Sequence, residues 1–428
     1  MNKHAKTMYQ ARRARLAQMI GDAFFVLRGA GEMTRNNDVI YPFRQESSFL
    51  YLTGWTHPDA FLIIEGGEHP RSMIFFDPQG ERERLFNENL PTYDAAIRNY
   101  GFDDARARTH EFVTTLNELA KVKQVLYHDA HAPLTFSDFS LAPYVEDMMR
   151  DGNGILATIR IIKDGVEITA MRKAAHISGL AHRELMKCVH PGCTEYQLAA
   201  LFAYRVSCAG ADPQNAYPSI VASGEHACTL HYVKNSAKIR DGDLVLVDAG
   251  CEIDGYASDI TRTFPANGTF TEAQRILYEI VLGAQKLAIM AAACGNTIGD
   301  VHKTASLAIA SGLIRQGILK DPNPETAVKT GSTKRFFPHG TSHWLGLDVH
   351  DIGDYSKGQR ELVPGMVITV EPGIYIPKDM KDVDKRFRGI GIRIEDDVLI
   401  TENGNEVLSW KAPKETDEIE EIVSAGHS

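Results

Sequence analysis

The sequence predicts an α/β protein built from more than one domain, and three observations carry this prediction. Short apolar runs rich in β-branched residues alternate with longer helix-like stretches along the chain. With 428 residues, the chain is longer than one ordinary core organises, so two or three domains are expected. Hydrophobic residues make up 43% of the chain and charged residues 24%, which is typical of a soluble globular protein.

Charge and composition exclude several classes of partner. The net charge of −10 argues against a nucleic acid or an anionic membrane, because both require clustered cations. No apolar run approaches the ~20 residues that span a bilayer. The cysteines form no CxxC pair and match no zinc-binding spacing, so we expect reduced thiols in a cytoplasmic protein. These cysteines are Cys188, Cys193, Cys208, Cys228, Cys251 and Cys294.

The first segment of the chain has no acidic residue before Asp22, a feature that mitochondrial transit peptides share. We expect an amphipathic first helix instead, because a strand-like run at 23–27 follows it directly. The residues in near-helical spacing are Met8, Ala11, Arg15, Leu16 and Met19.

Residues 21 to about 160 predict an α/β region that carries no catalytic constellation of its own. Helix-like stretches cover residues 92–100 and 106–121. The expected strands are short, apolar and bounded by polar turns. They cover residues 23–27, 61–65, 73–76 and 123–127.

The composition changes around residues 155–175, where we place the domain boundary. A strand is expected to end near Lys163, and an Asp-Gly pair then precedes a helix that runs to about Cys188. The sequence therefore predicts one domain over residues 1–160 and a second over residues 161–428.

The second region alternates helices with pairs of strands. A helix over residues 194–210 and a short strand over 220–223 come first. Thr271 begins a capping box that opens a long helix, and Thr297 opens another. The stretch 321–335 contains two prolines and is expected to be an exposed connector.

The central feature of this second region is a predicted hairpin between residues 244 and 264. Its first apolar run, residues 244–247, has the length of a buried strand and ends on Asp248. An Asp-Gly pair follows, which hairpin turns favour because both central residues need positive φ. The second run carries Asp259 and several β-forming residues.

The pairing of the hairpin leaves two registers open. With the Asp-Gly pair as the two turn residues, Asp248 lies opposite Thr261. With the turn one residue earlier, Asp248 lies opposite Asp259. In both registers the two carboxylates point from the same face, with Cβ atoms roughly 5 to 8 Å apart. Two carboxylates held this close on buried strands require a proton or a cation between them.

Further polar residues follow the connector. Three histidines, His339, His343 and His350, lie within twelve positions. The apolar strand expected at 366–370 ends on Glu371, which repeats the arrangement of Asp248.

The last strand-like run, residues 391–400, alternates apolar and polar side chains. Ile392 and Ile394 are expected to face one way, with Arg393 and Glu395 on the other side. A surface charge pair is the alternative interpretation of these two polar residues.

Together these segments supply four carboxylates and one imidazole from strands or strand ends. Such a set suits hard or borderline divalent cations, Mn²⁺ best, with Co²⁺, Fe²⁺ and Zn²⁺ as alternatives. Four buried anions exceed the charge of one divalent ion, so we infer two ions, roughly 3.5 Å apart, that hold a hydroxide and polarise a carbonyl. Hydrolysis of an acyl or amide bond is the expected reaction class. The five residues are Asp248, Asp259, His343, Glu371 and Glu395.

Six motifs together resemble those of the pita-bread metallopeptidases, and within them of aminopeptidase P (Xaa-Pro aminopeptidase). They are YPFRQESSFLYLTG, LHYVKN, VDAG with SDITRTF, HGTSHWLGLDVHD, VEPGIY and IRIEDDVLI, and they extend from about Tyr41 to past Ile400. The resemblance implies an α/β (α+β) protein. Its N-terminal creatinase-like domain has a mixed sheet with helices, and its C-terminal pita-bread domain has two pseudo-symmetric halves around a dimetal site.

The resemblance also assigns a role to each predicted ligand. It implies that Asp259 and Glu395 bridge two metal ions, that Asp248 completes one ion, and that His343 and Glu371 complete the other. A metal-bridging hydroxide would attack the carbonyl before proline, with Glu371 as proton shuttle.

Further residues match positions that contact the substrate in the family. His231 and His350 match histidines that flank the substrate, stabilise the tetrahedral oxyanion and line the proline pocket. His339 matches another pocket histidine, and Arg393 an arginine that pairs with the metal-binding carboxylates. The remaining matches to substrate-binding positions are Asp38, Arg160 and Tyr375.

The function that the resemblance implies is removal of an N-terminal residue that precedes proline. Prolidase, which cleaves only Xaa-Pro dipeptides with the same ligands, is the alternative. The order Ser342-His343-Trp344 favours aminopeptidase P, because prolidases more often have Gly-His there. A non-catalytic pita-bread binding module is a different class, and such relatives lose metal ligands that are all present here.

The resemblance further implies peptide substrates with proline at the second position, and a homodimer or homotetramer. Residues 84–96 depart from the family, because they lack its frequent WxGxR pattern. This departure argues against a contribution of the N-terminal domain to the active site of a neighbouring subunit.

Overall fold

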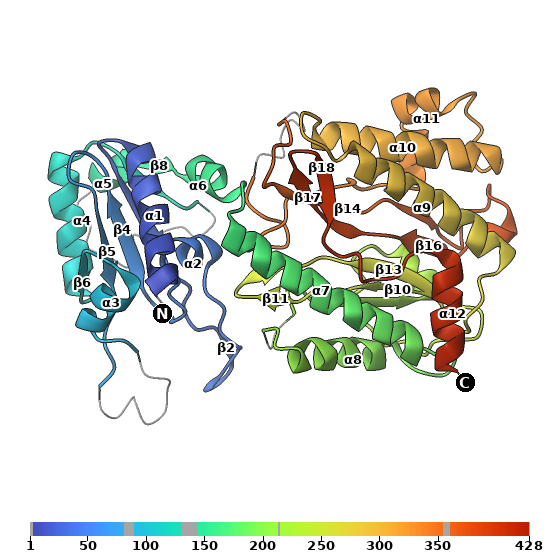
Figure 1. The fold of residues 1–428 in the computed structure, drawn as a ribbon, viewed down its shortest axis with the longest axis horizontal. Helices are drawn as coiled ribbons and strands as arrows, with labels where there is room; N and C mark the ends of the chain where they lie inside the picture. Colours follow the sequence, from blue (N-terminus) through green and yellow to red (C-terminus); the bar gives the residue numbers. More distant parts are fainter. Residues whose placement is uncertain (1–2, 81–89, 131–143, 213–214, 354–359, 428) are drawn as a thin grey trace. The chain divides into compact units, whose positions relative to one another are not determined.

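The structure, a computed structural model, describes residues 3–80, 90–130, 144–212, 215–353 and 360–427. The chain forms two compact units, Met1–Arg160 and Ile161–Ser428 (Figure 1). Residues 84–89, which belong to the stretch without the family's WxGxR pattern, lie outside the described residues.

The first unit is built on a six-stranded mixed sheet with the order β6-β5-β4-β1-β7-β8. The β1–β4 and β4–β5 pairs are antiparallel, and the other three are parallel. The strands are β1 (Phe24–Arg28), β4 (Phe61–Glu65), β5 (Arg71–Phe75), β6 (Asp104–Arg106), β7 (Leu126–His128) and β8 (Met149–Asp151).

Helices cover both faces of this sheet. On one face, Phe24 and Val26 of β1 join a core with Phe112 and Leu116 of α4. On the other face, Arg13 of α1 donates a hydrogen bond to Ser72 of β5 at 3.1 Å. The helices are α1 (Lys3–Ile20), α2 (Ser47–Thr53), α3 (Tyr93–Tyr100), α4 (His110–Val122), α5 (Tyr144–Met148) and α6 (Asn153–Arg160), and a separate hairpin pairs β2 (Thr34–Asn36) with β3 (Val39–Ile40).

The first helix forms as predicted, but the prediction of which of its residues form the buried face is mostly wrong. Met19 is 41% exposed, and the buried face consists instead of Arg12, Arg13, Leu16, Ala17 and Ile20. The two arginines can be buried because their guanidinium groups donate to backbone carbonyls. Arg12 donates to Tyr51 and Arg13 to Leu52 and Gly101.

Two other predictions in this unit are corrected. The helix expected from residue 106 begins at His110, because residues 104–106 pair with β5 as an edge strand. The strand expected to end near Lys163 is helix α6, whose buried residues Leu156, Ile159 and Arg160 follow helical spacing.

The second unit consists of two halves of similar construction. Each half contains two long helices, which a three-stranded antiparallel sheet follows in the chain. The strand order is β13-β10-β9 in the first half and β14-β17-β18 in the second. This is the pita-bread arrangement that the resemblance implied. The first half contains α7 (Gly165–Cys188), α8 (Glu195–Cys208), β9 (Ile220–Ser223), η3 (Gly224–Cys228), β10 (Leu244–Asp248), β11 (Glu252–Ile253), β12 (Tyr256–Ala257) and β13 (Thr261–Pro265).

The second half ends the chain. Its elements are α9 (Glu272–Ala291), α10 (Ile298–Arg315), α11 (Pro324–Thr330), η4 (Ser332–Arg335), β14 (Val367–Val370), β15 (Gly373–Ile376), η5 (Lys385–Phe387), β16 (Ile390–Arg393), β17 (Asp396–Thr401), β18 (Gly404–Val407) and α12 (Thr416–Gly426). None of the helices in the described residues combines the length and apolar character that a membrane span requires.

Local sequence signals explain how these helices begin. Capping boxes open α7, α9 and α10, with Asp164, Thr271 and Thr297 as the N-cap residues. The connector expected at 321–335 is corrected, because Asn323 caps the short helix α11 within it.

The predicted hairpin takes the first of its two registers. Ile253 pairs with Tyr256, so Asp254 and Gly255 are the turn residues, with φ of +53° and +80°. Asp248 then lies opposite Thr261.

The run at 391–400, expected as one alternating strand, is two strands in different sheets. Strand β16 pairs with β15 and ends at Arg393, whereas β17 starts at Asp396 and pairs with β14. The chain therefore changes sheets at Ile394 and Glu395, and both faces of this segment are buried.

This change of sheet joins the two halves. The backbone N–H of Glu395 donates to the carbonyl of Thr261 at 3.1 Å, and the Thr263 hydroxyl donates to the carbonyl of Arg393 at 3.0 Å. Between them, the fully buried Arg262 forms an ion pair with Asp396 at 2.6 Å.

Arg262→Met tests this junction. The substitution removes the guanidinium's bonds to the carbonyls of Ala412 and Pro413 as well as its ion pair with Asp396. We expect the free energy of unfolding of the second unit to fall by about 3–5 kcal/mol in urea denaturation. Arg275→Met, which removes partly exposed ion pairs, is the control and should cost less than about 1 kcal/mol. Equal losses in the two variants would contradict the role of Arg262.

Candidate active site

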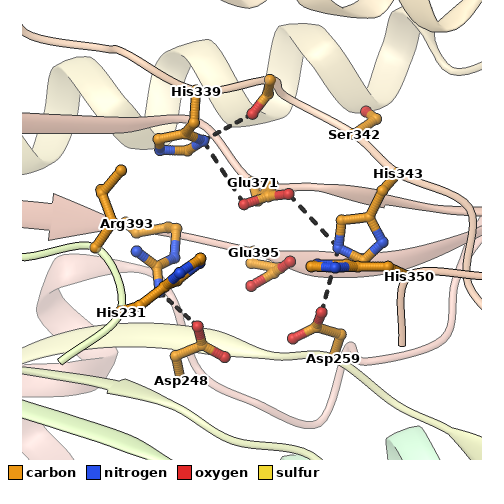
Figure 2. Close-up of a pocket in the computed structure, with 12 residues that line it drawn as sticks. His231, Asp248, Asp259, His339, Ser342, His343, His350, Glu371, Arg393 and Glu395 are labelled. Atoms are coloured by element: carbon orange, nitrogen blue, oxygen red, sulfur yellow. Dashed lines mark hydrogen bonds and ion pairs between the residues drawn. The ribbon is translucent and has the colours of Figure 1, made fainter. Parts of the chain in front are cut away.

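A pocket of about 260 Å³ lies where strands of both halves of the second unit end (Figure 2). Its carboxylates come from β10, from the residues just before β13 and just after β14, and from the segment between β16 and β17. The residues that line it are Leu230, His231, Asp248, Asp259, His339, Gly340, Ser342, His343, His350, Glu371, Arg393 and Glu395.

The pocket brings together all five predicted metal ligands. It also contains four of the other predicted site residues, namely His231, His339, His350 and Arg393.

The other three predicted site residues do not line this pocket. Asp38 is an exposed residue in the turn between β2 and β3 of the first unit. Arg160 also belongs to the first unit, where it is buried and donates to the Ser48 hydroxyl at 2.9 Å. Tyr375 is buried directly beside the pocket, with its hydroxyl bonded to Arg393 at 3.1 Å and to His339 at 2.8 Å.

The donor atoms of three pocket residues are close enough to share one metal ion. In Asp259, His343 and Glu395, one ligand atom of each lies within 4.8 Å of those of the other two. The Nδ1 atom of His343 lies 3.0 Å from the carbonyl oxygen of Trp344, to which it can donate. With Nδ1 donating there, Nε2 faces the carboxylates and, once it loses its proton, would offer a lone pair to a metal ion.

The crowding of the carboxylates alters how they ionise. Burial raises the pKa of Glu371 to about 7, and burial together with the charge of Asp259 raises the pKa of Glu395 well above its usual value. Burial opposes the charged form of His343, yet its hydrogen bond to Asp259 and the charge of Glu371 raise its pKa to about 9. Protons thus offset part of the negative charge of the carboxylates, and bound divalent cations would do the same. Four carboxylates and one imidazole are a donor set that fits such ions.

Arg393 neutralises one side of the cluster. Its guanidinium forms an ion pair with Asp248 and donates from Nε to the Thr261 hydroxyl at 3.0 Å. That hydroxyl in turn donates to Glu395 at 2.7 Å. Because Arg393 is 5% exposed and Glu395 2%, the alternative of a surface charge pair is excluded.

The sequence interpretation missed Tyr217. Its hydroxyl lies 2.7 Å from Oδ1 of Asp248 and 2.6 Å from Oδ1 of Asp259, so it bridges the two aspartates. Burial and the charge of Asp248 raise the pKa of Tyr217 well above its usual value, so the phenol stays protonated and can donate. Tyr217 belongs to a loop before β9 without a recognisable motif, and no local signal identifies it.

Asp397 was missed as well. Its buried carboxylate accepts from the backbone N–H of Asp259, with N–O distances of 3.1 and 3.2 Å. The interaction fixes the backbone that carries the Asp259 carboxylate.

Two other pocket histidines, His339 and His350, have lowered pKa values, in contrast to His343. Burial, reinforced by the charge of Arg393, lowers the pKa of His339 to about 3, and burial with the charge of His343 lowers that of His350. His339 is therefore neutral at pH 7, with Nδ1 2.7 Å from the carbonyl of Gly340 and Nε2 2.8 Å from the hydroxyl of Tyr375. A neutral imidazole offers one donor and one acceptor.

Known proteins match both units. Residues 169–402 match Metallopeptidase family M24, and residues 9–127 match the aminopeptidase P N-terminal domain. The Xaa-Pro aminopeptidase of Haemophilus influenzae is 40% identical over 433 residues, with 99% of each chain covered.

Two solved structures of aminopeptidase P from Escherichia coli cover 99% of both chains at 37% identity. One holds the inhibitor Pro-Leu and has a TM-score of 0.92, and the other is zinc-substituted, holds product and has a TM-score of 0.93. The fold and family implied by the sequence motifs are confirmed. The chain belongs to metallopeptidase family M24, among the members built like aminopeptidase P.

Proposed function

We propose that this protein is an Xaa-Pro aminopeptidase, which hydrolyses the peptide bond between an N-terminal residue and a following proline. The observation that carries the proposal is the pocket of four carboxylates and His343, lined on its other sides by His231, His339 and His350. Relatives with this name match nearly the whole chain, and the matching Escherichia coli structure binds the proline-containing dipeptide Pro-Leu.

The five predicted ligands would hold two divalent ions, which we propose to be Mn²⁺ because oxygen donors outnumber nitrogen four to one. The ligands are Asp248, Asp259, His343, Glu371 and Glu395. Bound there, the ions would supply a water of lowered pKa and polarise the carbonyl of the scissile bond.

The protein's own groups then have distinct tasks. Glu371, whose carboxylate lines the pocket directly after β14, is suited to take a proton from the attacking water and pass it to the leaving proline nitrogen. His231 and His350, which line the pocket, would donate N–H groups to the developing oxyanion. Arg393 holds Asp248 in position, and through Tyr375 it also orients His339.

We propose that residues 1–160 form an aminopeptidase P-like N-terminal domain and that residues 161–428 form the catalytic domain, in keeping with the two compact units. The six cysteines all lie in the described residues as free thiols, which supports a reducing, cytoplasmic location.

The central test compares a tripeptide Xaa-Pro-Xaa with a dipeptide Xaa-Pro in the presence of Mn²⁺. An aminopeptidase P releases the N-terminal residue faster from the tripeptide, and a chelator abolishes the release. Liquid chromatography of the free amino acid measures both rates. Cleavage of the dipeptide alone would identify a prolidase, and cleavage of neither would refute the proposal.

Glu371→Gln removes the proposed proton carrier but leaves an oxygen ligand of nearly the same shape. We expect kcat to fall at least about 100-fold, because general base catalysis contributes this much or more. Steady-state kinetics with saturating Mn²⁺ measure the change. Glu402→Gln, at an exposed turn after β17, is the control and should keep the wild-type rate. A near-normal kcat for Glu371→Gln would rule out the proton-carrier role.

His343→Ala removes the imidazole from the candidate metal cluster. We expect the purified variant to retain at most one tightly bound ion per chain, because the ligand set loses its nitrogen donor. Inductively coupled plasma mass spectrometry counts the ions. His176→Ala, on the exposed face of α7, should keep the wild-type content. Two tightly bound ions in His343→Ala would show that His343 is not a ligand.

A further inference from the structure

His231 is carried into the pocket by a loop and not by a strand. The segment of residues 224–237, named here the His231 loop, leaves β9 and places Leu230 and His231 in the pocket wall. His231 is exposed, and its ring has no hydrogen-bond partner among the described residues. Its position is therefore set by the loop backbone.

Glu195, the first residue of α8, holds both ends of this loop. At the start of the loop, its Oε1 accepts from the backbone N–H of Ser223 at 2.9 Å and from the Ser223 hydroxyl at 2.8 Å. At the end of the loop, its Oε2 accepts from the backbone N–H of Ala237 at 2.8 Å. One carboxylate thus connects two points that lie fourteen positions apart in the chain.

The same carboxylate also contacts side chains inside the loop. The hydroxyl of Tyr232, the neighbour of His231, donates to Oε2 at 2.9 Å, and Nδ1 of His226 lies 3.2 Å from Oε1. The rings of His226 and Tyr232 stack at 4.6 Å. The loop is therefore held at its two ends and beside the residue that enters the pocket.

Glu195 is suited to hold the loop as an anion. It is fully buried, and burial opposes its ionisation, but the N–H donors of Ala237 and Ser223 hold its pKa below the usual value. Its place in the first turn of α8 also favours a negative charge. Asn235 adds a second anchor, bonded to Val221 and Ser219, but it reaches neither Tyr232 nor the start of the loop.

We propose that Glu195 is a positioning residue, which fixes the His231 loop so that His231 meets the oxyanion of the substrate. This inference rests on the proposed function for the role of His231. A purely structural role for Glu195 is the alternative, and the two make different predictions when Glu195 and His231 are replaced together.

A double-mutant cycle separates the two roles. In Glu195→Gln, the carboxamide cannot accept from all five donors, so the loop loses its fixed position. We expect kcat/KM for the tripeptide to fall about 10- to 100-fold, because a small displacement of a catalytic group lowers the rate by this much. Most of the loss should be in kcat. In the His231→Ala background, the same change should lower kcat/KM less than about twofold. Losses that multiply in the double variant would overturn the proposal.

A second measurement is independent of activity. Hydrogen exchange followed by mass spectrometry should show faster exchange in residues 224–237 of Glu195→Gln, with metal content equal to the wild type. Glu225→Gln, an exposed acid on the same loop that pairs with Lys378, is the matched control and should change neither exchange nor kcat/KM. Unchanged exchange in Glu195→Gln would refute the proposal that Glu195 fixes the His231 loop. This result does not depend on whether the protein cleaves Xaa-Pro peptides.

Tyr232→Phe covers the case in which Glu195→Gln does not fold. It removes one donor to Glu195 and leaves the ring packed against the apolar cluster of Ile220, Ala222, Ala227 and Leu246. We expect a smaller fall in kcat and a smaller rise in exchange, both confined to the same loop. A wild-type kcat and exchange pattern in this variant would contradict the proposal.

Discussion

The repulsion between four carboxylates in one buried pocket is the constraint on which the rest of the second unit depends. Left uncompensated, such a cluster would push its strands apart, because charges in a low-dielectric interior interact strongly. The structure compensates it with Arg393, the protonated His343 and the bridging hydroxyl of Tyr217. Bound divalent ions would replace the protons in this balance.

The scaffold behind the pocket keeps these anions at close range. Segments from both halves meet where Glu395 bonds to Thr261, and the buried pair of Arg262 and Asp396 lies beside that junction. Lys414 adds a second cation on Asp396 at 2.6 Å. A rigid, fully paired network behind the site allows the ligands themselves to remain in an electrostatically unfavourable arrangement.

The two sides of the pocket are built differently. The carboxylates are carried on strands and strand ends, which neighbouring strands hold in place. His231 is carried on a loop instead, and its ring has no hydrogen-bond partner among the described residues. A buried carboxylate such as Glu195 supplies to that loop the fixed backbone contacts that a sheet supplies to a strand. Such contacts allow a loop to hold a side chain with the precision that catalysis requires.

The sequence alone determined the helix caps, the Asp-Gly hairpin turn, the family and the group of residues that share the pocket. These features depend on local propensities and on motifs that short segments carry. The tertiary structure decided that Arg12 and Arg13 face inward, that residues 391–400 form two strands, and that Tyr217, Asp397 and Glu195 support the site. Each of these depends on partners distant in the chain, because a buried polar group is stable only where a tertiary neighbour completes its hydrogen bonds.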